Sequence, residues 1–192
     1  LDDDALMLFT SGTTGTPKGV VHTFRSLLAR IEMNQLFIKK DHLSKTMCPL
    51  PTHFGHGLIG NCLTPIFAGC SLVMGEGVNV KTASKLGQVV DQHKITFMSS
   101  VPALWKLVIK VSKRPTKSML RVQVGSAPLS KDLWDKIVDW TGTRAVYNLY
   151  GITETANWFA GGSAEDDNYG DGFVGQPWGG TAAVLTEDGK IL

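Results

Sequence analysis

The residues most capable of chemistry lie near the start of the chain, in the run Phe9-Thr10-Ser11-Gly12-Thr13-Thr14-Gly15-Thr16-Pro17-Lys18-Gly19. Its glycines allow several backbone N–H groups to point toward one centre, and such concavities bind anions. Hydroxyl side chains and one ammonium group add donors for phosphate oxygens. The run is not a Walker sequence, because Pro17 stands where that motif needs its second glycine. We interpret the run as a triphosphate-binding loop of another kind; the alternative is a polar surface loop.

A second polar segment, Asn148-Leu149-Tyr150-Gly151-Ile152-Thr153-Glu154, follows a predicted strand. The ring of Tyr150 can stack on a nucleobase, and the Asn148 amide can hydrogen-bond the edge of the base. Thr153 can donate to a phosphate oxygen, and Glu154 offers the hard oxygen ligand that Mg²⁺ prefers. The alternative is a strand that ends in an ordinary turn, with Glu154 capping a helix.

Two further segments also follow predicted strands. In one of them a strand runs into a tight turn and a capped helix, over Val124-Gly125-Ser126-Ala127-Pro128-Leu129-Ser130. A plain strand-to-helix connection has the same pattern. In Pro49-Leu50-Pro51-Thr52-His53-Phe54-Gly55-His56-Gly57 the two histidines could be metal ligands, bases or loop residues. No acidic residue lies nearby in the sequence, and two histidines three residues apart give poor support for a metal site.

Regular alternation of short apolar runs and amphipathic segments surrounds these motifs. Strands are predicted at residues 46–48, 72–74, 95–98, 122–124 and 145–149, and helices at residues 23–35, 58–67, 80–93, 102–111 and 131–140. Asn79 and Ser130 are candidate N-caps, and Pro102 suits a first helical turn. This alternation predicts an α/β fold with a mostly parallel sheet covered by helices on both faces. A small β element is expected to begin near the C-terminus. Ligands bind such sheets at the carboxyl ends of the strands, where the polar motifs fall.

Composition excludes several classes of function. The 192 residues are 43% hydrophobic and 19% charged, which is typical of a globular chain. A net charge of +2 gives no support for nucleic-acid binding. No apolar run approaches the ~20 residues of a membrane span. Cys48, Cys62 and Cys70 lie in apolar surroundings and are predicted to be buried free thiols, which favours a cytoplasmic location.

Together, the loop at residues 9–19, the turn at 124–130 and the Tyr150-Gly151-Ile152-Thr153-Glu154 element resemble the signature motifs of the adenylate-forming superfamily of acyl-CoA synthetases, luciferases and peptide synthetase adenylation domains. The resemblance covers essentially the whole chain. It implies ATP and AMP binding by Thr10, Ser11, Gly12, Thr13, Thr14, Gly15, Lys18, Gly125, Ser126, Ala127, Pro128, Asn148, Leu149, Tyr150, Gly151 and Thr153. It also implies catalytic roles for Thr10, Lys18, Thr153 and Glu154, with Glu154 holding Mg²⁺.

The same resemblance implies an acyl pocket. When Pro51 and the nearby glycines are aligned with the family's motif, His53 and Phe54 fall near the position of an aromatic gate between the ATP and acyl sites. Phe54 is the better candidate for the gate residue. Gly125 would border the pocket. Trp158 could close it, although a buried core tryptophan is the more common case.

The implied reaction joins a small carboxylic acid to ATP, releases pyrophosphate and passes the acyl group to coenzyme A or a carrier phosphopantetheine. The alternatives are an amino-acid- or aryl-acid-adenylating domain that loads a carrier protein, and a non-catalytic ATP-binding module. We expect a fragment that lacks the family's C-terminal domain and is inactive alone. Its predicted parts are a phosphate-loop hairpin at residues 1–22, belonging to an incomplete subdomain, a nucleotide- and acyl-binding α/β subdomain at 23–160, and a truncated β segment at 161–192.

Overall fold

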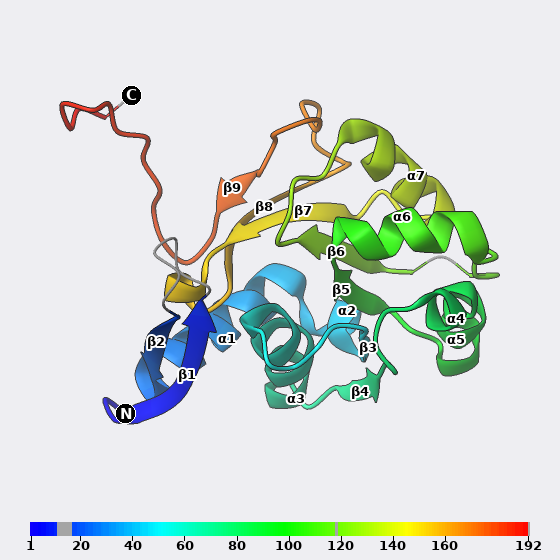
Figure 1. The fold of residues 1–192 in the computed structure, drawn as a ribbon, viewed down its shortest axis with the longest axis horizontal. Helices are drawn as coiled ribbons and strands as arrows, with labels where there is room; N and C mark the ends of the chain where they lie inside the picture. The colour runs from blue at the N-terminus through cyan, green and yellow to red at the C-terminus, as the bar shows by residue number, and fades with distance from the viewer. Residues whose placement is uncertain (11–16, 118, 192) are drawn as a thin grey trace.

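A seven-stranded sheet forms the centre of the computed structural model, which describes residues 1–10, 17–117 and 119–191. In spatial order its strands are β4 (Ser71–Met74), β3 (Lys45–Cys48), β5 (Phe97–Ser100), β6 (Arg121–Gly125), β7 (Val146–Gly151), β8 (Trp158–Ser163) and β9 (Gln176–Pro177). The first five are mutually parallel, and β8 and β9 are antiparallel to their neighbours (Figure 1). The predicted mostly parallel sheet is confirmed.

Helices cover both faces of the sheet, as predicted. One layer contains α4 (Val80–Ser84), α5 (Leu86–His93), α6 (Pro102–Val111) and α7 (Lys131–Thr141). These helices bury residues such as Trp105 and Trp134 against Met98, Val122 and Val146 of the sheet. The other layer contains α1 (Phe24–Ile38), α2 (Lys40–Leu43), the π-helix η1 (His56–Leu63) and α3 (Thr64–Phe67). Because successive side chains of a strand point to opposite faces, Phe97 faces this second layer while Met98 faces the first.

Local sequence signals decide most helix boundaries. The side chains of Asn79 and Ser130 cap α4 and α7, and Pro102 opens α6, as predicted. The segment predicted as one helix at residues 58–67 is instead a π-helix followed by a short α-helix. The one at residues 80–93 is broken at Lys85.

The C-terminal β element is smaller than expected. Within the described residues it consists of one antiparallel bridge between Leu185 and Ile191, with Thr186 N–H donating to the Lys190 carbonyl at 2.9 Å. The division of the chain into three parts stays a prediction. All three cysteines are free; Cys48 and Cys62 are buried, as predicted, whereas Cys70 is only partly buried. No helix in the described residues is long and apolar enough to cross a membrane.

A separate two-stranded sheet carries the ends of the glycine-rich run. Strands β1 (Asp4–Thr10) and β2 (Lys18–Thr23) pair antiparallel, and Thr10 lies opposite Lys18. Leu8 of β1 packs in one apolar cluster with Ile59 of η1 and with Ala156. Thr10 lies two residues beyond Leu8 and therefore on the same face of the strand. The hairpin thus ends beside the segment that follows β7.

Candidate active site

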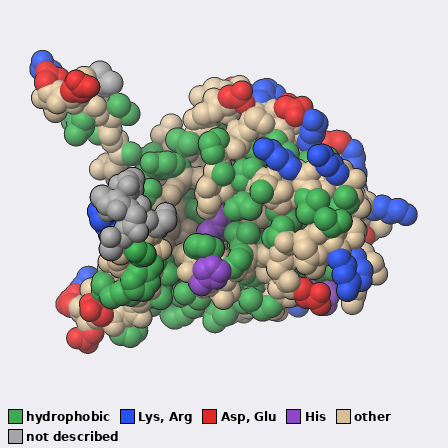
Figure 2. All heavy atoms as spheres, in the orientation of Figure 1, with side chains coloured by type: hydrophobic (Ala, Val, Ile, Leu, Met, Phe, Trp, Pro, Cys, Tyr) green, Lys and Arg blue, Asp and Glu red, His purple; other side chains and the backbone are tan. Residues whose placement is uncertain are grey.

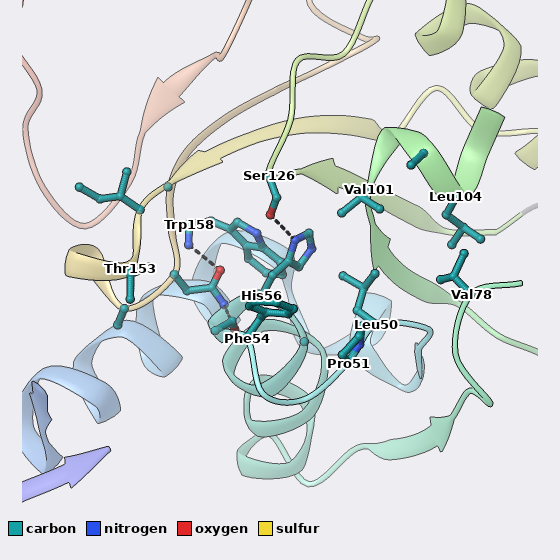
Figure 3. Close-up of a pocket in the computed structure, with 17 residues that line it drawn as sticks. Leu50, Pro51, Phe54, His56, Val78, Val101, Leu104, Ser126, Thr153 and Trp158 are labelled. Atoms are coloured by element: carbon teal, nitrogen blue, oxygen red, sulfur yellow. Dashed lines mark hydrogen bonds between the residues drawn. The ribbon is translucent and has the colours of Figure 1, made fainter. Parts of the chain in front are cut away.

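A cavity of about 680 Å³ opens where β3, β5, β6 and β7 end (Figure 3). In the space-filling view it is a hollow bordered by hydrophobic side chains, with histidine beside it (Figure 2). The residues that line it come from the ends of these strands and the loops after them, from the loop after β4, from the first residue of β8, and from the N-terminal parts of η1 and α6. They are Leu50, Pro51, Phe54, Gly55, His56, Gly57, Val78, Val101, Ala103, Leu104, Ser126, Gly151, Ile152, Thr153, Ala156, Asn157 and Trp158.

His56 is a polar side chain of the cavity lining that is held at both of its ring nitrogens. Its Nδ1 lies 2.8 Å from Ser126 Oγ and its Nε2 lies 2.7 Å from Ser99 Oγ. A neutral imidazole has one donor and one acceptor nitrogen, so one serine hydroxyl donates to the ring and the other accepts from it. Burial lowers the pKa of His56 to about 3, so the ring is neutral at physiological pH. The sequence pattern left His56 as a metal ligand, a base or a loop residue and did not connect it to Ser99 or Ser126.

The π-helical geometry of η1 explains how His56 reaches the sheet. Asn61, five residues later, contacts the same strand residue: its Nδ2 donates to the Ser99 carbonyl at 2.9 Å, and its Oδ1 accepts from Ser99 N–H at 3.1 Å. In an α-helix, residues five apart point about 140° away from each other at 100° per residue. In a π-helix the N–H of residue i+5 bonds the carbonyl of residue i, so the two side chains lie on the same side of the helix. The geometry therefore directs both side chains to Ser99.

The neutral His56 ring makes stability depend on pH. The unfolded chain, with a histidine pKa near 6.5, binds more protons than the folded chain between pH 6.5 and about 3. The contribution of the neutral His56 ring to the free energy of unfolding is fully present above pH 6.5. It decreases as the pH falls, by about 2.5 kcal/mol between pH 7 and pH 4.5. Urea denaturation at pH 7 and pH 4.5 measures the free energy of unfolding at each pH. His56→Gln should remove the part of the difference between the two values that comes from His56. His93→Gln, at an exposed histidine, should retain it; equal pH dependence in both variants would contradict the assignment.

The turn after β6 holds its serine in a strained conformation. Ser126 has a φ of +64°, in the left-handed region that side chains other than glycine rarely adopt. Its hydroxyl is held by His56 and its side chain lines the cavity (Figure 3). Gly125 is buried at the end of β6, and Ala127 and Pro128 are exposed in the turn; within the described lining of the cavity, only Ser126 represents this turn.

Two of the four residues expected at an acyl pocket line this cavity. Trp158 is 3% exposed, packs edge-on to His56 at 5.1 Å between ring centroids, and forms one wall. Its ring lies over Gly60, where a Cβ atom would come within 2.3 Å of it. Phe54 is 56% exposed at the mouth, and its ring lies 4.1 Å from that of His53. Neither His53 nor Gly125 is among the described residues that line the cavity.

The residues expected to bind the nucleotide lie in the sheet, in the lining of the cavity, or at its rim and outside the described residues. Leu149 of β7 lies opposite Gly125 of β6, so these motifs are adjacent in the sheet. The Tyr150 side chain is 46% exposed, whereas Asn148 is buried and its Nδ2 donates to the Phe173 carbonyl at 2.7 Å. Gly151 and Thr153 line the cavity.

The remaining expected residues lie at the rim or outside the described structure. Glu154 is exposed in the short 3-10 turn η2 (Thr153–Thr155). Thr10 and Lys18 lie at the end of the β1–β2 hairpin. Ser11, Gly12, Thr13, Thr14 and Gly15, all expected to bind phosphate, lie outside the described residues.

The fold and its cavity define an α/β protein that presents a ligand site at the carboxyl ends of parallel strands. The whole chain, residues 1–192, matches the family described as AMP-binding enzyme, and the chain belongs to this family. The resemblance to adenylate-forming enzymes inferred from the motifs is thereby confirmed.

Individual relatives agree with this assignment. The chain is 30% identical over 190 residues to a dimodular nonribosomal peptide synthase of Bacillus subtilis, covering 98% of this chain and 8% of that protein. It is 27% identical over 202 residues to a 4-coumarate–CoA ligase-like protein of Arabidopsis thaliana, covering 100% and 35%. The solved O-succinylbenzoate coenzyme A synthetase of Bacillus subtilis, in complex with ATP and magnesium ion, shares the fold, with a TM-score of 0.85, 24% identity, and coverage of 100% and 39%. The chain therefore spans well under half the length of these relatives.

Proposed function

We propose that this chain provides the ATP and acyl sites of an enzyme that activates a carboxylic acid as an acyl-adenylate and transfers the acyl group to coenzyme A. The observation that carries the proposal is the 680 Å³ cavity at the strand ends, lined by Thr153 on one side and by apolar side chains on the other. An anionic reacting group and an apolar acyl tail need this combination. The names of two relatives, a CoA ligase-like protein and a synthetase that binds ATP and magnesium, support it.

The proposed reaction requires positioning more than covalent chemistry by the protein. The substrate carboxylate attacks the α-phosphorus of ATP, the bond to the pyrophosphate breaks, and pyrophosphate leaves. Lys18 and the hydroxyl of Thr10, with Ser11, Thr13 and Thr14, would hold the β- and γ-phosphates and stabilise the charge of the leaving group. Thr153 would donate to the α-phosphate.

The adenine would lie against the turn that contains Gly125, Ser126, Ala127 and Pro128. Tyr150 is exposed enough for its ring to stack on the base. One of the two Nδ2 hydrogens of Asn148 bonds the Phe173 carbonyl, so Asn148 would contribute through its Oδ1 or its second N–H.

A divalent cation fits the carboxylate at the rim. Within the described chain, no cluster of three or more His, Cys, Asp or Glu side chains could hold a metal by itself. Mg²⁺ commonly uses one or two carboxylates and takes its other ligands from substrate phosphates and water. The exposed Glu154, one residue after Thr153, is suited to this role. When bound, the ion would neutralise charge on the phosphates.

ATP–pyrophosphate exchange tests the proposal. We expect the full-length gene product that carries this sequence to exchange labelled pyrophosphate into ATP only when a suitable carboxylic acid is present. Thioester formation with coenzyme A is measured in parallel, and the 192-residue chain is assayed beside it. Binding of Mg·ATP without exchange for any aliphatic, aromatic or amino acid would overturn the proposal in favour of a non-catalytic nucleotide-binding module.

A further inference from the structure

The distribution of polar and apolar groups gives the cavity two distinct ends. Thr153 lies at one end (Figure 3). Val78, Val101 and Leu104 lie at the other, with Leu50 and Pro51 beside them. A carboxylic acid whose carboxylate reacts near Thr153 would place the rest of its chain among these apolar side chains.

No described residue that lines this space has a formally charged side chain. None of the described residues that line the cavity is Asp, Glu, Lys or Arg. The titratable group in the lining, His56, is neutral at physiological pH because burial lowers its pKa to about 3. Both of its ring nitrogens already bond serine hydroxyls, so it is not a ready partner for a charged tail.

An apolar lining favours the binding of uncharged substrate tails over charged ones. A second carboxylate or an ammonium group on the substrate tail would lose its hydration among apolar side chains and meet no opposite charge in the described lining, which weakens its binding. An uncharged apolar tail would instead gain free energy as its surface and the pocket surface leave water.

We propose that the substrate is a carboxylic acid with an uncharged, predominantly apolar tail, and that the pocket discriminates against dicarboxylic acids and against acids that carry an ammonium group at the far end of the tail. This inference rests on the proposed function of the site. The side chains that carry it are Val78, Val101, Ala103 and Leu104, together with the neutral His56.

Three acids with the same five-methylene spacer test the proposal directly. Heptanoate, pimelate and 6-aminohexanoate differ only in a terminal methyl, carboxylate or ammonium group. With the full-length gene product, we expect kcat/KM for acid-dependent exchange to be about 10²–10⁴-fold higher for heptanoate than for either charged analogue. Equal rates for the charged and uncharged members would overturn the substrate class and leave the proposed adenylation intact.

A charge placed in the pocket should change this preference. Ala103 is exposed at the second position of α6 and lines the cavity. Ala103→Lys should raise the pimelate-to-heptanoate ratio of kcat/KM by about ten-fold or more. Val111→Lys, at the last residue of the same helix and outside the cavity lining, is the matched control and should keep the original ratio. An unchanged ratio in Ala103→Lys would place the tail elsewhere.

Isothermal titration of the same acids in the presence of Mg·ATP separates the two proposals. Stronger binding of heptanoate than of pimelate or 6-aminohexanoate supports the pocket assignment even if no exchange occurs, in which case the failure lies with the proposed reaction. Equal binding of all three acids contradicts the pocket assignment.

Discussion

Replacing Glu154 with glutamine is expected to lower kcat for acid-dependent exchange by about 10²–10³-fold, with a much smaller loss of acid binding. The side chain is exposed in η2, directly after Thr153 at the cavity. Within the described part of the chain it makes no hydrogen bond or ion pair, so its replacement should leave the fold intact. The amide keeps the size of the carboxylate but loses its charge and most of its affinity for Mg²⁺.

The dependence on magnesium concentration distinguishes this role from a structural one. The half-saturating Mg²⁺ concentration should rise in Glu154→Gln, and high Mg²⁺ should restore part of the activity. Glu165→Gln is a suitable control, because Glu165 is also exposed but lies beyond β8 and outside the described lining of the cavity. A Glu154→Gln variant with wild-type magnesium dependence would remove Glu154 from the ion site.

Asn61→Leu is expected to destabilise the chain by about 3 kcal/mol, which is the second large effect. Strand β3 pairs with β5 only at Phe97 and Met98, so the backbone of Ser99 has no strand partner on that side. The Asn61 side chain supplies both hydrogen bonds instead, and it is fully buried. Leucine would leave a buried N–H group and a buried carbonyl unsatisfied, and each of these costs about 1–3 kcal/mol.

Asn34→Leu provides the comparison. Asn34 is equally buried in α1, but its Nδ2 donates over 3.3 Å to the Thr64 hydroxyl, which also bonds the Ile59 carbonyl. Its loss orphans no backbone group, so a decrease of about 1 kcal/mol is expected. Urea denaturation of both variants measures the difference. Equal losses would show that Asn61 does not act as a substitute for the missing strand partner.

Much of the fold could be predicted because its signals are local. Alternation of short apolar runs with amphipathic segments indicated the parallel sheet, and Asn79, Pro102 and Ser130 marked helix starts that the structure confirms. The cavity also lies where the motifs and the strand ends indicated. These features depend on residues a few positions apart.

The less predictable part depends on contacts between distant segments. Ser99 meets His56 and Asn61 only after the chain has folded, and nothing in the spacing of residues 56–63 distinguishes a π-helix from an α-helix. The apolar lining from Val78 and Val101 likewise comes from packing. Asn148 carried a plausible signal for base recognition, yet its buried position beside Phe173 could not be read from its neighbours in sequence.

The π-helical segment also bears on which changes in chain length the protein can tolerate. His56 and Asn61 both reach Ser99 because the π-helical turn brings residues five apart to the same side of η1. Inserting one residue between them would place them six apart, and in a helix of 100° per residue such side chains point about 120° away from each other. Deleting one residue would place them four apart, about 40° from each other in an α-helix, so both contacts to Ser99 would be kept if η1 became α-helical. Insertions at residues 57–60 should therefore be rarer among functional descendants of this sequence than single deletions that convert η1 to an α-helix.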